Sequence, residues 1–143
     1  MLKAGLVSLV LAYMLSQFYR AFLAVLAPVL QDQVGAGPGD LALSSGLWFI
    51  AFALMQLPVG AALDRFGPRR TVAWLMAVGG AGGAVIFAMA DAPWHLHLAM
   101  TALGIGCSPA LMGPYFIFAR EYPPASFGML AGVLVGFGSL GNI

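Results

Sequence analysis

The sequence predicts an all-α integral membrane protein, in which several apolar helices cross a lipid bilayer as a bundle. Only 8% of its 143 residues are charged, too few to cover a water-soluble globule. The mean hydropathy is +0.95. The apolar residues gather in segments of about 20, the length of a helix that spans the hydrocarbon core. These observations indicate a chain that folds in lipid.

Five such segments divide the chain, separated by short polar stretches that contain proline and glycine. The predicted helices cover residues 4–27, 41–63, 71–90, 95–119 and 127–143. The first is expected to stop at Pro28, before the loop QDQVGAGPGD. A cleaved signal peptide is not expected here, because the apolar segment is too long and contains Arg20.

The basic residues predict an orientation, because lysine and arginine are retained on the cytoplasmic side of a membrane. Five of them lie before the first segment or in the second and fourth connections: Lys3, Arg65, Arg69, Arg70 and Arg120. The first and third connections contain aspartates but no lysine or arginine. We therefore expect a cytoplasmic N-terminus and an odd number of spans, in the cell (inner) membrane.

Composition and motifs also exclude several classes of function. A net charge of +1 supplies no basic stripe for nucleic acid. The single Cys107 cannot form a disulfide within the chain. His95 and His97 are two residues apart, so a helix points them to different faces, which suits an interfacial anchor better than a metal site. No catalytic set or phosphate-binding loop is present, and we expect neither an enzyme, a cofactor nor a metal.

A polar stripe interrupts the first apolar segment. Tyr13, Gln17 and Arg20 are spaced i, i+4 and i+7, so they share one face of a helix. Arg20 is expected about 10 Å inside the outer end of its span, where a charge is costly unless it faces a cavity or a partner. We assign the stripe to a substrate pathway, with Arg20 attracting an anionic group. The alternatives are a structural cation paired within the bundle and an arginine that snorkels outward.

Polar residues of two other segments are weaker candidates for the same pathway. Gln56 shares a face of the second segment with Trp48, and Tyr115 follows Ser108 by seven residues in the fourth. A buried glutamine can instead bond a neighbouring helix.

Glycines at four-residue spacing predict surfaces where helix backbones approach closely. Gly79 and Gly83 form such a pair in the third segment, and Gly128, Gly132 and Gly136 form a row in the fifth. We assign all five to helix packing.

The connection between the second and third segments is VGAALDRFGPRR, residues 59–70. Gly60 permits close helix approach, Asp64 ends the second span, and Gly67 with Pro68 turns the chain into the third helix. Its last part, GAALDRFGPRR, resembles the signature loop of the major facilitator superfamily. The residues that match the pattern are Gly60, Asp64, Arg65, Gly67 and Arg69, with Arg70 beside them. Two positions depart from it: Ala62 replaces a preferred leucine, and Pro68 replaces the first closing basic residue.

The resemblance covers all five segments and implies a facilitator-type helix bundle, of which this chain would be an incomplete N-terminal half. Such proteins carry a small-molecule substrate by alternating access between two six-helix halves. In the family the loop's acid and arginine resemble a latch on a helix N-terminus of the other half, so the partners implied are that C-terminal half and the lipid bilayer. The arginines alone could instead serve as a topology determinant.

One departure concerns coupling. Many proton-coupled members carry an arginine in the fourth helix before a glycine pair, and residues 97–103 contain none before Gly104 and Gly106.

Because the fifth segment is still apolar at Ile143, we expect a longer native transporter. The alternatives are a non-transporting membrane scaffold and a small transporter that assembles with itself.

Overall fold

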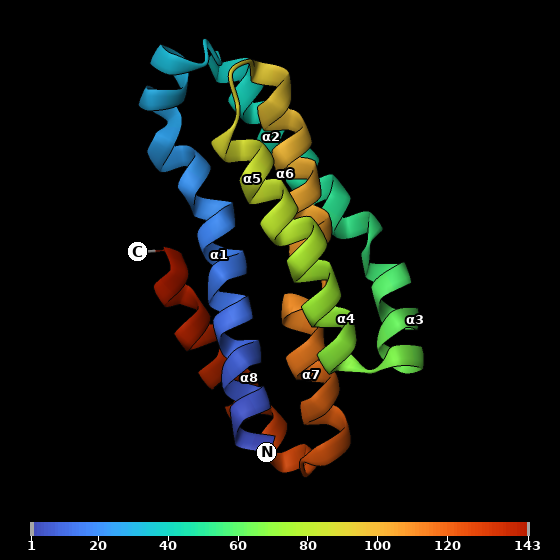
Figure 1. Cartoon of the computed structure of the whole chain (residues 1–143). Coiled ribbons are helices and arrows are strands. Elements are labelled where there is room, and N and C mark those ends of the chain that lie inside the picture. The colour runs from blue at the N-terminus through green and yellow to red at the C-terminus, as the bar shows by residue number, and fades with distance from the viewer. Residues whose placement is uncertain (1, 143) are drawn as a thin grey trace.

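A computed structural model describes the backbone of residues 2–142 and the side chains of residues 5–142. That part of the chain is helical throughout, with short connections and no strand (Figure 1). The elements are α1 (Leu2–Gln33), α2 (Pro38–Leu54), α3 (Gln56–Phe66), α4 (Pro68–Leu75), η1 (Met76–Ala81), α5 (Gly82–Ala88), α6 (Pro93–Cys107), α7 (Pro109–Glu121), α8 (Pro124–Ser139) and η2 (Leu140–Asn142). η1 is a π-helical segment and η2 a 3₁₀ turn.

These elements combine into membrane-length helices. Four are long and apolar enough to cross a bilayer, namely Gly5–Gln33, Pro68–Ala88, Pro93–Glu121 and Pro124–Asn142. A fifth candidate is the pair α2 and α3, which bends by 43° at a short break. With the bent pair counted as one span, the described residues form an all-α membrane bundle with five spans, the fold class that the sequence predicts.

The charged connections lie at opposite ends of this bundle. Figure 1 places the N-terminus, the α3–α4 connection and the α7–α8 connection at the lower end, and the other two connections at the upper end. Arg65, Arg69 and Arg120 therefore gather at the lower end. The side chain of Lys3 lies outside the described residues. The upper end carries Asp91 in the α5–α6 connection.

The first helix is longer than predicted. α1 continues through Pro28 to Gln33, six residues beyond the expected end. Proline lacks an amide hydrogen, but a spanning helix tolerates it where neighbouring groups compensate. As a result, Arg20 lies thirteen residues before the helix end, about 20 Å along the axis.

The second predicted helix is broken rather than continuous. α2 ends at Leu54, Met55 interrupts the helix, and α3 begins at Gln56. Pro58 explains the position, because it cannot donate a hydrogen bond to the carbonyl of Leu54 and its ring crowds that carbonyl. The sequence analysis missed the consequence: α3 diverges from α2 by 43°.

A second proline break, between α6 and α7, is compensated by a side chain. Pro109 cannot donate to the carbonyl of Ile105, four residues earlier. The hydroxyl of Ser108 donates to that carbonyl instead, at 2.6 Å. Ser108 is completely buried, so its hydroxyl repairs the helix and does not line a pathway, contrary to the sequence-based expectation.

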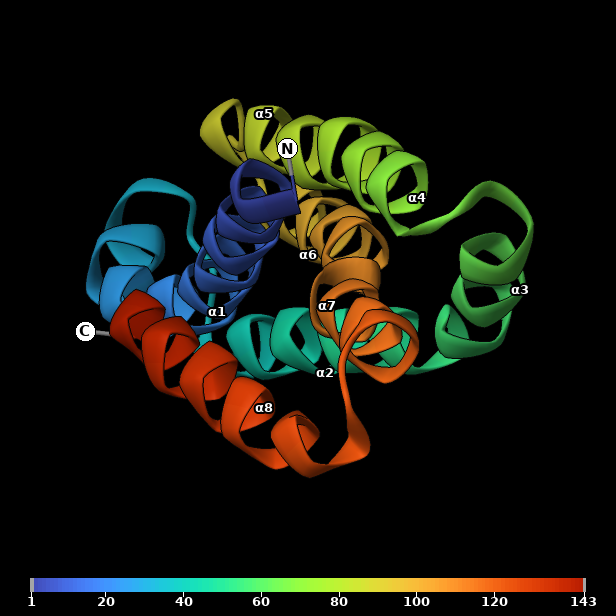
Figure 2. The same ribbon diagram turned by 90° about the horizontal axis from the view of Figure 1, so that it is seen from below.

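α6 is the central helix, with α5 on one side and α2 on the other (Figure 2). The largest core cluster surrounds it and consists of Leu23, Leu30, Ala36, Trp48, Leu96, Met100, Leu103 and Cys107. Glycines allow the backbones to meet. A methyl group on Gly79 would lie 2.6 Å from Gly106 Cα, and one on Gly104 would collide with the carbonyl of Trp48.

The glycines of the fifth span behave differently from the prediction. A methyl group on Gly128, Gly132 or Gly136 would meet no atom of the described chain within 4 Å. The close contacts of this span come from Gly138, which lies against the ring of Tyr13, and Gly141, which lies against the carbonyl of Met14. The four-residue row therefore packs against no helix of the described chain, and residues nearer the C-terminus approach α1.

The α5–α6 contact gives a test of this packing. We expect Gly83→Ala to lower the free energy of unfolding by about 1–3 kcal/mol, because the new methyl group would lie 2.9 Å from the carbonyl oxygen of Ala99. Gly82→Ala is the matched control, since its methyl group would meet nothing within 4 Å. The measurement is the unfolding midpoint of the purified protein in detergent. Equal midpoints for the two variants would contradict the packing.

Candidate functional site

The polar stripe of α1 is preorganised by a hydrogen bond. Gln17 Nε2 donates to the hydroxyl oxygen of Tyr13 at 2.9 Å. Tyr13 is buried, Gln17 is half-buried and Arg20 is exposed. The stripe therefore runs along one helical face from the packed interior at Tyr13 to an exposed surface at Arg20.

Residues of α7 and α8 surround the buried end of this stripe. Tyr13 belongs to a second core cluster with Ala110, Phe118 and Leu134, against which Tyr115 packs. Tyr115 contacts Phe127 of α8, with ring centroids 5.7 Å apart. The structure thus brings Tyr13 of α1 and Tyr115 of α7 into one cluster beside α8, with Gln17 and Arg20 further along the same face of α1.

Arg20 has no carboxylate partner among the described residues. The ion pairs there join His95 to Asp91, His97 to Asp40 and Arg120 to Asp64. The guanidinium sits near the middle of the 29-residue span Gly5–Gln33. A charge at this depth requires a polar or anionic neighbour. The arrangement can bind an anion with the five donors of the guanidinium.

Gln56 is separate from this group. Its side-chain amide donates to the carbonyl of Phe52 at 2.8 Å, within its own span at the α2–α3 break. Trp48, predicted on the same face, is 4% exposed and stacks on Phe52 in the core between α2 and α6. Gln56 therefore bridges the broken helix, and Trp48 is a core residue rather than part of a cavity wall.

The upper end holds two histidine–aspartate pairs. His95 Nδ1 lies 2.8 Å from Asp91 Oδ1, and His97 Nε2 lies 3.8 Å from Asp40 Oδ1. Asp40 also accepts a hydrogen bond from the amide of Gly37 at the start of α2, so the second pair joins α2 to α6. Sequence reasoning missed both pairs: His95 and Asp91 are four residues apart, a spacing that was the available signal, whereas His97 and Asp40 meet only after the helices pack. The described residues contain no cluster of metal-binding side chains.

The loop between α3 and α4 is a one-residue turn. Gly67 alone separates the two helices, with φ 81° and ψ 161°. This backbone conformation is open essentially only to glycine. Pro68 begins α4, where a missing amide hydrogen costs little, and Thr71 donates to the carbonyl of Ala62 at 3.2 Å across the turn. A methyl group on Gly60 would meet nothing within 4 Å, so the close approach predicted there is absent from the described chain.

The charges of this loop contact α7. Asp64 Oδ1 lies 3.3 Å from a guanidinium nitrogen of Arg120. Arg65 lies over the ring of Phe66, with its guanidinium 5.6 Å from the centroid. Arg69 and Arg70 are exposed. The sequence analysis used Arg120 only to predict orientation. Its predicted place on the same side of the membrane as Asp64 was the available signal that the two could pair.

Comparison with known proteins identifies the family. The profile of the Major Facilitator Superfamily matches residues 9–143, almost the whole chain. The chain belongs to the Major Facilitator Superfamily. This membership agrees with the helical bundle and with the position of the signature loop between the second and third spans.

The chain is also similar to three curated proteins. The uncharacterized transporter YybO of Bacillus subtilis is 30% identical over 118 residues, covering 80% of this chain and 26% of that protein. A quinolone resistance transporter of Acinetobacter baumannii is 27% identical, covering 90% and 29%. The probable sulfoacetate transporter SauU of Cupriavidus necator is 26% identical, covering 92% and 30%.

The chain thus spans less than a third of the length of the curated relatives it matches. No solved structure matches it significantly.

The signature turn of this superfamily member gives a second test. We expect Gly67→Ala to destabilise the fold by about 1–3 kcal/mol, because alanine would be held in a backbone region reserved for glycine. No atom crowds the position, so the cost is conformational. Gly60→Ala, in the adjoining helix and equally uncrowded, is the control. Unfolding midpoints in detergent provide the measurement, and a neutral Gly67→Ala would refute the role of the turn.

Proposed function

We propose that this chain forms part of the N-terminal half of a secondary transporter that moves a small organic anion by alternating access. The observation that carries the proposal is the guanidinium of Arg20, near the middle of a membrane span and without a carboxylate partner among the described residues. Intramembrane charges are retained where they act, since each costs several kcal/mol in hydrocarbon. An anionic substrate would supply the missing countercharge.

The neighbours of Arg20 support a substrate role. Gln17 and Tyr13 hold each other by a hydrogen bond, which restricts their rotamers before any ligand binds. In this proposal the second N–H of the Gln17 amide donates to the ligand beside the guanidinium. Tyr115 of α7 packs against the cluster that contains Tyr13.

The printed names of the relatives are compatible with this class of substrate. The relative from Cupriavidus is named for sulfoacetate, which carries a sulfonate and a carboxylate. The relative from Acinetobacter is named for quinolone resistance, so the names do not select one compound. An organic anion is the substrate class that both the guanidinium and one of these names support.

We further propose that the lower end of Figure 1 is cytoplasmic. The N-terminus and the arginine-bearing connections meet there, which suits the retention of basic residues on the inner side. Asp64 then acts as the cytoplasmic latch. In one state its carboxylate pairs with Arg120, and in the other it caps a helix N-terminus of the second half.

Arg20 provides the test of substrate class. We expect Arg20→Gln in the full-length protein to lower uptake of sulfoacetate or a related organic anion into proteoliposomes by about 10- to 100-fold, since a charged hydrogen bond is worth roughly 1.5–3 kcal/mol.

Arg20→Lys keeps the charge without the planar fork and should retain part of the uptake. The amount of membrane-inserted protein should match the wild type in both variants. Undiminished uptake in Arg20→Gln would exclude the proposed site, and loss of inserted protein in both would indicate a structural cation. Failure of the wild type to transport any organic anion would favour a scaffold.

Asp64 provides the test of the latch. We expect Asp64→Asn to slow transport while substrate binding is retained, because the site around Arg20 lies far from the loop. Stability should change by less than about 1 kcal/mol, since both partners of the ion pair are largely exposed.

Arg120→Gln is the matched variant. If only the pair matters, both substitutions slow transport equally. If Asp64 also contacts the second half of the transporter, Asp64→Asn slows transport more than Arg120→Gln does. Normal turnover in Asp64→Asn would contradict the latch.

A further inference from the structure

An apolar groove lies between α3 and α4, apart from the polar stripe of α1. Its volume is about 510 Å³. Val59, Ala62 and Phe66 form the α3 wall, and Trp74 and Leu75 form the α4 wall. Among the described residues that line it, Arg70 is the only charged one. The groove therefore combines an apolar trough with a single cation.

The length of the groove matches one leaflet of a bilayer. It exists because the 43° bend at Met55 turns α3 away from the bundle. From Met55 at its inner limit to Phe66 at its mouth, the α3 wall is about 16 Å long, whereas half of a hydrocarbon core is about 15 Å. Arg70 lies near the mouth, beside the α3–α4 turn. The cation therefore lies at the level of a lipid headgroup, and the apolar walls are about as long as an acyl chain of one leaflet.

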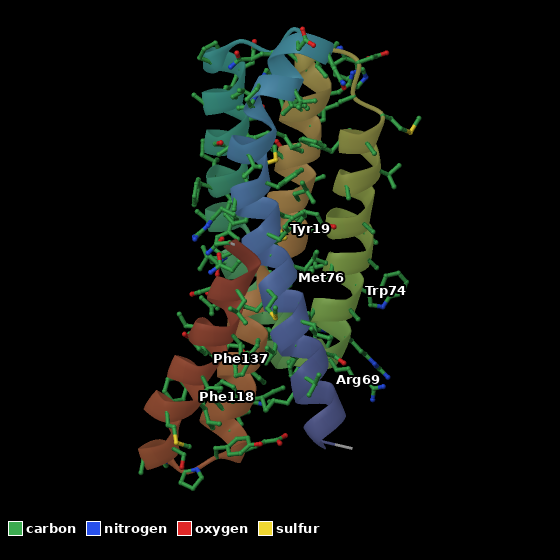
Figure 3. All side chains as sticks on the ribbon, turned by 90° about the vertical axis from the view of Figure 1, so that its left-hand side faces the viewer. Tyr19, Arg69, Trp74, Met76, Phe118 and Phe137 are labelled. Atoms are coloured by element: carbon green, nitrogen blue, oxygen red, sulfur yellow. The ribbon has the colours of Figure 1, made fainter. Side chains whose placement is uncertain are left out.

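The groove borders an exposed apolar surface of the third span. Trp74, Val78, Val85 and Met89 are 57–73% exposed and are spaced by four, seven and four residues, so they form one outward stripe along the third span. Figure 3 shows Trp74 and Arg69 pointing away from the bundle on the same side, opposite α8. Tryptophan and arginine together are typical of the membrane interface.

The arginines beside the groove favour an anionic lipid headgroup. Arg69 and Arg70 are exposed and neither has a carboxylate partner among the described residues. The nearby carboxylate of Asp64 is already paired with Arg120. Basic pockets between spanning helices bind anionic headgroups. We propose that this groove binds an anionic phospholipid of the surrounding bilayer, with an acyl chain between α3 and α4 and the phosphate on Arg70 and Arg69.

Occupation of the groove would hold α3 against α4. α3 makes few contacts with the rest of the bundle, and it carries Asp64 at its lower end. The lipid therefore acts on the segment that bears the signature acid, and its binding can be measured without any transport assay.

The test uses the full-length protein purified in detergent and titrated with dioleoylphosphatidylglycerol while the unfolding midpoint is recorded. Dioleoylphosphatidylcholine supplies the same chains with a zwitterionic headgroup, and glycerol phosphate supplies the anion without chains. Arg70→Gln removes the cation, and Ala62→Phe fills the trough. Arg65→Gln is the matched control, because it removes a cation from the same end outside the groove and leaves the Asp64–Arg120 pair in place.

We expect the anionic lipid to raise the midpoint more than either control ligand. Arg70→Gln should weaken the apparent affinity about fivefold, as one basic residue near an anionic headgroup contributes roughly that factor. Ala62→Phe should abolish the shift, and Arg65→Gln should leave it unchanged. Equal shifts with both lipids, an unchanged shift in Arg70→Gln and Ala62→Phe, or equal loss in Arg65→Gln would each overturn the proposal. A groove filled by another segment of the transporter would give no shift with lipid.

Discussion

The contact on which the bundle depends is the approach of the α6 backbone to its neighbours on both sides. Gly104 meets the carbonyl of Trp48 on α2, and Gly106 meets the backbone of Gly79 and Gly80 in η1. In lipid, helices gain little from burying apolar area, so association depends on close van der Waals packing between small residues. Larger residues at these glycines would move α2 or η1 outward. The position of α6 thereby fixes the spans that flank it.

Prolines modify this framework at two places, with opposite results. At Pro109 the carbonyl of Ile105 accepts from both the amide and the hydroxyl of Ser108, and α6 and α7 remain one membrane span. At Pro58 the crowding of Leu54 is not relieved in this way, and α3 turns away by 43°. The same residue type therefore gives a nearly continuous central helix and a divergent peripheral one. Two features distinguish the continuous helix from the bent one. They are the side chain that precedes the proline and how deeply the helix is buried around it.

The sequence predicted what depends on composition and local spacing. Five apolar segments, their approximate limits and the Gly67 turn could be read directly, because lipid requires helices of a minimum length and a one-residue turn requires glycine. The end of α1 was wrong, since tertiary packing decides whether a helix passes Pro28. Gln56 was grouped with the pathway although it bonds to Phe52. The Asp64–Arg120 pair joins residues 56 positions apart, and no local pattern reveals such a contact.

The same reasoning separates two kinds of arginine in this chain. Arg69, Arg70 and Arg120 lie at one end of the bundle, where water and headgroups can solvate them, so their presence needs no buried partner. Arg20 lies near the middle of α1. In a membrane-spanning helix a charge at such a position needs polar or anionic neighbours. Ser16 and Gln17, four and three residues earlier, are the nearest polar side chains on its own helical face.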